Sequence, residues 1–280
     1  MVERIDASWH WHQMMNKIGI LQGRLTPSNG RGIQFFPDEN WQNEFETAKK
    51  IGFDCIELLV KKENLEGNPL FSEKGRKEIS RLKDTYKIET PSVHGFYSKE
   101  SDYKGIMVEL VKNAQEVGAK TILVSFFKDS TLKTDADKKL AREQLAQAIK
   151  VAEAIGSRIA IEAEMLAPEL KDLIKSFNSG AVGAYYDIGN MVSMNANVID
   201  EIKFLGPLLF GVHIKDRTKN AGGTVPIGTG DGNFLSTLKA LKESGYNGPL
   251  ILQGARSETV DDINLNTKYF EYIKNILKTL

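Results

Sequence analysis

The chain has 280 residues, enough for one large domain or two small ones. Its 37 Lys and Arg residues equal its 37 Asp and Glu residues, so the overall basic bias that favours nucleic-acid binding is missing. The single cysteine, Cys55, excludes an intrachain disulfide and a structural Cys-rich zinc site. No apolar run approaches the roughly 20 residues of a membrane span, and the first residues lack a signal-peptide core. We therefore expect a cytoplasmic protein with neither a membrane nor a nucleic acid as its partner.

Residues 1–16 show no clear hydrophobic period. We expect this segment to be a flexible leader, because chain ends are usually mobile. His10 and His12, in the sequence WHWH, offer metal binding as the alternative reading. We place a single catalytic domain at residues 17–280.

From residue 17 onward, short apolar runs alternate with segments of helical periodicity. The predicted strands lie at residues 17–22, 53–60, 88–95, 119–126, 157–162, 181–187, 208–216 and 248–253. The predicted helices lie at residues 41–52, 72–86, 103–118, 132–156, 167–177, 197–206, 233–245 and 259–280. Several of these helices end at a glycine just before the next apolar run, as at Gly52, Gly118 and Gly156. Such alternation indicates parallel strands joined by helical crossovers.

Eight strand–helix units in a chain of this length predict an α/β fold, namely a single (β/α)₈ TIM barrel. A doubly wound open sheet is the alternative fold. It normally carries a GxGxxG phosphate loop after an early strand, and the early segment ILQGRLTPSNGRG contains none.

Four predicted strands end in a residue that can bind a metal ion. These residues are Glu162, Asp187, His213 and Gln253. Because the C-terminal ends of all strands in a parallel barrel open onto one face, the four side chains should converge. Two carboxylates, an imidazole and an amide oxygen suit a divalent cation. The pattern predicts a metal centre, while Gln253 also fits the reading of a hydrogen-bonded polar residue at the barrel mouth.

Two further residues should lie inside the barrel or at its mouth. His94 ends the third predicted strand, where it either binds substrate or has a structural role. Glu57 lies within the second predicted strand, and we expect it to pair inside the barrel or to orient a metal ligand.

Cationic residues follow the last two predicted strands. Lys215 and Arg217 come just after His213, where they could hold an anionic substrate or a developing oxyanion, or form salt bridges with their neighbours. Arg256 follows the final strand, where barrels often bind phosphate. The glycine-rich stretch PIGTGDGNF, at residues 226–234, is either a phosphate loop at a helix start or a plain turn.

With these residues the chain resembles the xylose-isomerase-like barrel superfamily, and within it the sugar-phosphate isomerase/epimerase group, which includes L-xylulose- and L-ribulose-5-phosphate 3-epimerases. The resembling stretches span nearly the whole chain from Lys17 and are WQNEFETAKKIGFDCIELLV, IAIE, YYDIGNM, GVHIKD, VPIGTGDGNF and LILQ. The resemblance implies a (β/α)₈ barrel with an Mn²⁺-class ion held by Glu162, Asp187, His213 and position 253. Such ligands also tolerate Mg²⁺, Co²⁺ and Zn²⁺. It further implies a small-molecule sugar or sugar phosphate as the substrate, and it leaves a homodimer open.

Two positions depart from the pattern of that group. The resemblance makes Glu162 and position 253 the two opposed acid/base residues, but position 253 is Gln instead of Glu. An amide cannot accept a proton as a base near neutral pH. Asn190 stands where the group has a substrate-binding histidine. Both departures bear on whether the reaction of the group is retained.

The function that we expect is metal-dependent isomerisation or epimerisation of a ketose or ketose phosphate through an enediolate, with Glu162 as the base. Without a second base, one-base isomerisation or weak epimerisation through water should result. A metal-assisted dehydratase of a cyclic ketone, of the inosose type, and a non-catalytic sugar-binding barrel are the alternatives. A DNA-repair endonuclease of the AP-endonuclease type is disfavoured, since it needs three zinc ions and many histidines, and this chain has 4 histidines.

Overall fold

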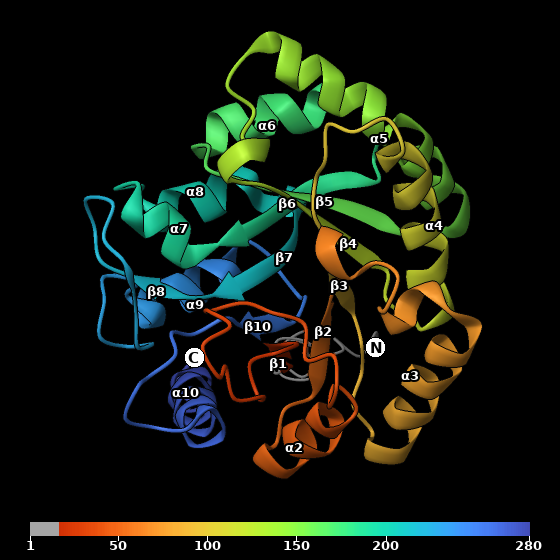
Figure 1. The fold of residues 1–280 in the computed structure, drawn as a ribbon. Coiled ribbons are helices and arrows are strands. Elements are labelled where there is room, and N and C mark those ends of the chain that lie inside the picture. Colours follow the sequence, from red (N-terminus) through yellow and green to blue (C-terminus); the bar gives the residue numbers. More distant parts are fainter. Residues whose placement is uncertain (1–16) are drawn as a thin grey trace, which may run out of the picture.

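The computed structural model of the chain describes residues 17–280, so the expected leader at 1–16, with His10 and His12, lies outside the described residues. Parallel strands form a closed barrel in the order β1-β10-β7-β6-β5-β4-β3-β2, with the helices around it (Figure 1). The barrel strands are β1 (Ile18–Leu21), β2 (Cys55–Leu59), β3 (Ser92–His94), β4 (Thr121–Phe126), β5 (Arg158–Ala163), β6 (Val182–Asp187), β7 (Leu209–Ile214) and β10 (Leu250–Leu252). The predicted (β/α)₈ barrel is confirmed, and the open-sheet alternative is excluded.

Each predicted helix has a counterpart in the structure, with ends that differ by a few residues. These helices are α2 (Asn43–Ile51), α3 (Glu73–Tyr86), α4 (Tyr103–Glu116), α5 (Asp135–Ile155), α6 (Ala167–Ser176), α8 (Val198–Leu205), α9 (Phe234–Glu243) and α10 (Asp262–Leu277). Some short elements that follow the strands were not predicted. A short helix, α7 (Ile188–Ser193), directly follows β6, and an antiparallel hairpin of β8 (Asp216–Arg217) and β9 (Thr224–Val225) follows β7.

The helix ends show why the sequence breaks where it does. Gly52 follows α2 with φ 109°, and its N–H donates to the carbonyl of Ala48. Gly156 closes α5 in the same left-handed region, with φ 71°. Residues with a Cβ rarely adopt this conformation, so a glycine at these points ends the helix and turns the chain back toward the barrel.

Strand pairing places the polar strand ends next to one another. Asp187 at the end of β6 is the register partner of His213 in β7. Glu162 in β5 pairs with Ser125 in β4. Because side chains alternate along a strand, Glu162 shares the inner face of the barrel with Ala160 two residues earlier. The barrel therefore brings the predicted metal ligands to one end.

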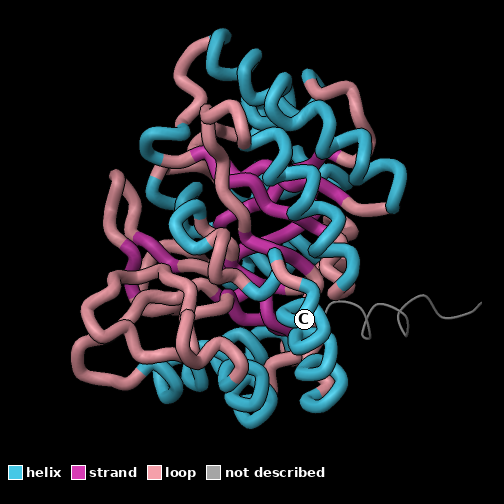
Figure 2. The backbone as a smooth tube through the Cα atoms, turned by 45° about the vertical axis from the view of Figure 1, so that its right-hand side comes forward, coloured by secondary structure: helices cyan, strands magenta, loops and turns pink. Residues whose placement is uncertain are grey.

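The apolar core lies mainly between the barrel and its helices. Phe45 and Ala48 of α2, for example, are completely buried in this layer. Figure 2 shows the strands (magenta) enclosed by helices (cyan), with long loops (pink) gathered on one side. Within residues 17–280, no helix combines the length and the apolar character that crossing a membrane requires.

Candidate metal centre

Three of the predicted ligands converge at the C-terminal end of the barrel. One ligand atom from each of Glu162, Asp187 and His213 lies within 4.8 Å of the others. The Nδ1 atom of His213 is 3.6 Å from Oε1 of Glu162 and 3.9 Å from Oδ2 of Asp187. All three side chains are buried, with His213 at 0% exposure. The strand-end positions in the sequence therefore correspond to one compact group of ligand atoms.

Glu57 fixes the orientation of the imidazole. Its Oε1 lies 2.7 Å from Nε2 of His213, so the opposite ring nitrogen faces the two carboxylates. Glu57 is held in turn by the hydroxyl of Ser92, which donates to Oε2 at 2.6 Å, and by the hydroxyl of Tyr185. A histidine that ligates a metal commonly donates its other ring N–H to a carboxylate in this way.

The charges around His213 favour a positive charge on the ring. Burial alone would lower the pKa of His213, but the carboxylates of Glu57 and Glu162 outweigh it and raise this pKa to about 10. Burial likewise opposes the charge on Glu57, yet the charge and hydrogen bond of His213 hold the pKa of Glu57 below its usual value. A metal cation bound at Nδ1 of the neutral ring would be attracted by the same carboxylates that favour protonation of the ring.

Buried polar atoms of the proposed ligands have no hydrogen-bond partner among the described residues. They are Oδ2 of Asp187, Nδ1 of His213 and Oε1 of Gln253. An unpaired buried polar atom costs about 1–3 kcal/mol. Oxygen and imidazole-nitrogen acceptors of this kind match the ligand preferences of divalent cations, so these residues fit a metal ion.

Gln253 directly follows β10 and is almost fully buried. Its backbone N–H donates to the carbonyl of Ile214 at 2.9 Å, which ties it to β7. Its Nε2 donates to Oε1 of Gln34 at 3.2 Å. Gln34 belongs to the segment between β1 and α2, and the sequence analysis missed it, because a glutamine in a polar loop carries no pattern that marks it.

Asn190, Lys215 and Arg217 form a polar cluster beside Asp187. The side-chain oxygen of Asn190 accepts from Nζ of Lys215 at 3.1 Å and from Nη1 of Arg217 at 3.2 Å. Nζ of Lys215 also lies 3.6 Å from Oδ2 of Asp187. The short helix α7 makes this cluster, because Asp187 caps it by accepting from the backbone N–H of Asn190 at 2.8 Å.

His94 lies next to the carboxylate group. Its Nε2 is 3.9 Å from Oε2 of Glu162, and its ring stacks on that of His213 with centroids 5.6 Å apart. Burial lowers the pKa of His94 and so favours the neutral ring. The carboxylate of Glu162 raises this pKa but does not outweigh burial.

Arg256 is engaged by the segment after β1. Its guanidinium donates to the carbonyls of Gly23 at 2.6 Å and Thr26 at 3.0 Å, and it pairs with Asp262 at the start of α10 at 2.7 Å. Through these contacts, Arg256 holds the loop that follows β1 against the start of α10.

The glycine-rich stretch at residues 226–234 binds an internal carboxylate. Asp216 accepts from the N–H groups of Gly228 and Gly230, each at 2.9 Å, and of Gly232 at 3.1 Å. A Cβ atom on Gly230 would lie 2.4 Å from Oδ1 of Asp216, so the close approach requires glycine. A carboxylate of the protein therefore occupies three amides of this stretch, which agrees with the plain-turn reading.

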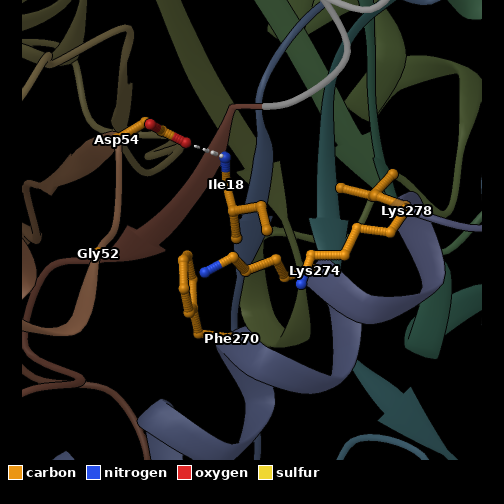
Figure 3. A pocket seen from close by; sticks show the side chains of 7 residues that line it. Ile18, Gly52, Asp54, Phe270, Lys274 and Lys278 are labelled. Carbon is orange, nitrogen blue, oxygen red and sulfur yellow. Dashed lines mark hydrogen bonds between the residues drawn. The ribbon is translucent and has the colours of Figure 1, made fainter.

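A cavity of about 470 Å³ lies at the other end of the barrel (Figure 3). It is lined by Ile18, Gly52, Asp54, Phe270, Lys274, Leu277 and Lys278. Ile18 begins β1, and its N–H donates to Asp54 at 2.8 Å. The cavity is therefore at the N-terminal end of the strands, away from the carboxylate–imidazole group.

Comparison with known proteins places the chain among barrel proteins related to sugar isomerases. A family model described as a xylose isomerase-like TIM barrel matches residues 45–273. The chain is 25% identical over 246 residues to the L-ribulose-5-phosphate 3-epimerase UlaE of Escherichia coli O1:K1, covering 80% of this chain and 85% of the relative.

Solved structures of low sequence identity share the fold. An L-ribulose 3-epimerase aligns over 95% of both chains with a TM-score of 0.75 and 16% identity. A xylose isomerase-like barrel protein from Mycobacterium smegmatis, determined in complex with magnesium, aligns over 96% of this chain and 98% of its own with a TM-score of 0.70 and 16% identity. Because the family model covers most of the sequence, the chain belongs to the xylose isomerase-like TIM-barrel family.

Proposed function

We propose that the protein is a divalent-metal-dependent isomerase or epimerase of a ketose or ketose phosphate. The observation that carries this proposal is the buried group of Glu162, Asp187 and His213, whose ligand atoms lie within 4.8 Å of one another. The similarity to an L-ribulose-5-phosphate 3-epimerase supports the substrate class.

Glu162, Asp187 and His213 would hold the ion, with Oε1 of Gln253 as the fourth ligand. Mn²⁺ is the ion that we propose, and Mg²⁺, Co²⁺ and Zn²⁺ suit the same donors. When bound, such an ion acts as a Lewis acid that polarises the substrate carbonyl.

Glu162 is the proposed base. One of its oxygens faces His213 and the other faces His94, at 3.6 Å and 3.9 Å respectively. One oxygen of Glu162 can therefore bind the ion, while the other takes the proton from the substrate carbon next to the carbonyl. A positioned base of this kind contributes about 10²–10⁴-fold to the rate.

Lys215 and Arg217 are the proposed electrostatic partners of the enediolate. Both direct their cationic groups at the side-chain oxygen of Asn190. A substrate oxygen that acquires negative charge near Asn190 would attract both groups. We assign hydroxyl binding to His94 and Asn190, and Arg256 is the candidate contact for a distal phosphate if it exchanges a loop carbonyl for the ligand.

Gln253 decides the stereochemical outcome in this proposal. An amide can ligate a cation but cannot return a proton to the opposite face of the substrate. We therefore propose one-base isomerisation, or slow epimerisation with water as the second proton donor.

Solvent-deuterium exchange at the α carbon tests the proposal. We expect the Mn²⁺-loaded protein to incorporate deuterium into at least one ketose or ketose 5-phosphate of a panel, as measured by NMR. Glu162→Gln should reduce the exchange rate at least about 10²-fold. Glu164→Gln, at an exposed position two residues away, is the matched control and should leave it unchanged. If no ketose or ketose phosphate exchanges in metal-loaded protein, the proposed function is wrong.

A further inference from the structure

Gln34 lies between two residues of the proposed site. Its Oε1 accepts from Nε2 of Gln253 at 3.2 Å, and its Nε2 lies 3.4 Å from Nε2 of His94. Gln34 comes from the segment at residues 22–42 between β1 and α2, which Figure 1 shows in red beside β10. It therefore connects strands β3 and β10 across the mouth of the barrel.

The segment that carries Gln34 is firmly anchored. The next two residues, Phe35 and Phe36, are buried. The guanidinium of Arg256 donates to the carbonyl of Ile33 at 3.1 Å and lies over the ring of Phe35, 4.7 Å from its centroid. Gln34 is thus held on both sides, and its amide has a defined position.

His94, Gln34 and Gln253 form a series of hydrogen bonds, and the series starts at a backbone carbonyl. The carbonyl of Gly95 lies 3.1 Å from Nδ1 of His94 and can only accept, so Nδ1 carries the hydrogen. The other ring nitrogen, Nε2, faces the amide nitrogen Nε2 of Gln34 at 3.4 Å, the arrangement in which Gln34 donates and His94 accepts. The oxygen of Gln34 consequently faces Gln253, whose facing atom must also be its Nε2.

With the amides oriented in this way, Oε1 of Gln253 is the last atom in the series His94–Gln34–Gln253. Oε1 is buried and has no hydrogen-bond partner among the side chains that the structure describes, as is also true of Oδ2 of Asp187 and Nδ1 of His213. If the amide of Gln253 were reversed, two N–H donors would replace this acceptor, and a cation would be repelled.

We propose that Gln34 is a positioning residue that acts through Gln253, holding its amide so that the oxygen is available to the metal ion. The inference rests on the proposed function in that it takes Gln253 as the fourth ligand. Gln34 does not touch the ion. Its effect is to determine whether the oxygen or the nitrogen of the Gln253 amide faces the ion.

Two substitutions separate this role from simple packing. Gln34→Met keeps the size of the side chain but removes the acceptor for Nε2 of Gln253. Gln34→Glu keeps that acceptor and places a charge in a half-buried position. A packing role predicts that Met is the better replacement, whereas the positioning role predicts that Glu is the better one.

The measurement is the Kd for Mn²⁺ of the full chain, determined by isothermal titration calorimetry. We expect Gln34→Met to raise the Kd about tenfold and Gln34→Glu to stay within about threefold of the unaltered protein. Gln42→Met, in the same segment, is the matched control and should leave the Kd unchanged. Thermal melting of the metal-free variants verifies that each is folded.

A double-mutant cycle provides the second readout. Gln253→Met alone should weaken Mn²⁺ binding, and adding Gln34→Met should cost nothing further, because Gln34 acts only through Gln253. The inference is overturned if Gln34→Met binds Mn²⁺ as tightly as the unaltered protein, if Gln34→Glu loses as much affinity as Gln34→Met, or if the two losses add in full. A protein that binds Mn²⁺ but exchanges no ketose proton would refute the proposed function while leaving this pattern of Kd values intact.

Discussion

Nε2 of His213 lies 2.7 Å from Oε1 of Glu57, on the edge of the ring opposite to the nitrogen that faces Glu162 and Asp187. Glu57 is completely buried in the barrel, where Ser92 and Tyr185 also donate to it. The carboxylate of Glu57 therefore orients the imidazole of His213 and places a negative charge next to it.

Glu57→Gln should weaken metal binding without removing any proposed ligand. The amide has nearly the same shape as the carboxylate but lacks its charge, and it no longer polarises His213. We expect the Kd for Mn²⁺ to rise about 10–100-fold, as is typical when the partner of a ligating histidine is lost. Glu63→Gln, an exposed position beyond β2, is the control. An unchanged Kd in Glu57→Gln would separate Glu57 from the metal.

Gln253→Glu should supply the second acid/base group that the resemblance to epimerases implies at position 253. At saturating Mn²⁺ we expect epimerisation to increase by about 10²-fold, because a general base replaces water. Product analysis by NMR distinguishes the epimer from the isomer. Gln42→Glu serves as the surface control. If Gln253→Glu leaves every rate unchanged, the chemistry of this protein does not use a second base at this position.

Asp216→Ala should destabilise the fold by about 3 kcal/mol or more, because hydrogen bonds to a charged group contribute about 1.5–3 kcal/mol each. Asp216 accepts from three glycine amides and is 1% exposed. Urea unfolding gives the change in the free energy of unfolding, and Asp231→Ala, an exposed carboxylate in the same loop, is the control. A loss of less than about 1 kcal/mol would contradict the assigned role of Asp216.

Asp137 should make the stability of the protein sensitive to strong acid. Hydrogen bonds from Lys99 and Thr134 lower the pKa of this carboxyl from 3.8 to about 2. Because its pKa is lower in the folded than in the unfolded chain, Asp137 contributes stability above about pH 4, and the contribution disappears as the pH falls to about 2. Asp137→Asn should therefore show a smaller decrease in the free energy of unfolding between pH 4 and pH 2. Asp135→Asn, in the same helical turn, is the control, and equal slopes in the three proteins would contradict the prediction.

The sequence predicts the barrel and the convergence of Glu162, Asp187 and His213 well, because both depend on local patterns. Apolar runs that end in Glu162, Asp187 and His213 define strands whose C-terminal ends must meet once the barrel closes. Helices that end in glycine, such as α2 at Gly52 and α5 at Gly156, give the alternation that identifies the fold.

The features that the sequence does not predict depend on loops that fold against distant strands. Gln34 gains its role only because its segment reaches Gln253, which is 219 positions away in the chain. Likewise, the amides at residues 226–234 meet Asp216 only because the chain turns back through the β8–β9 hairpin. No periodicity or composition marks either contact, since each is decided by the path of a loop.

The number of Mn²⁺ ions bound per chain, measured by calorimetry and elemental analysis, tests the central claim most directly. About one ion should bind per chain, because one group of converging ligands is proposed, and Asp187→Ala and His213→Ala should each abolish binding. Glu164→Ala, at an exposed position near the group, should bind as the unaltered protein does. Failure of the unaltered protein to bind a divalent cation, or full binding by both ligand variants, would contradict the account.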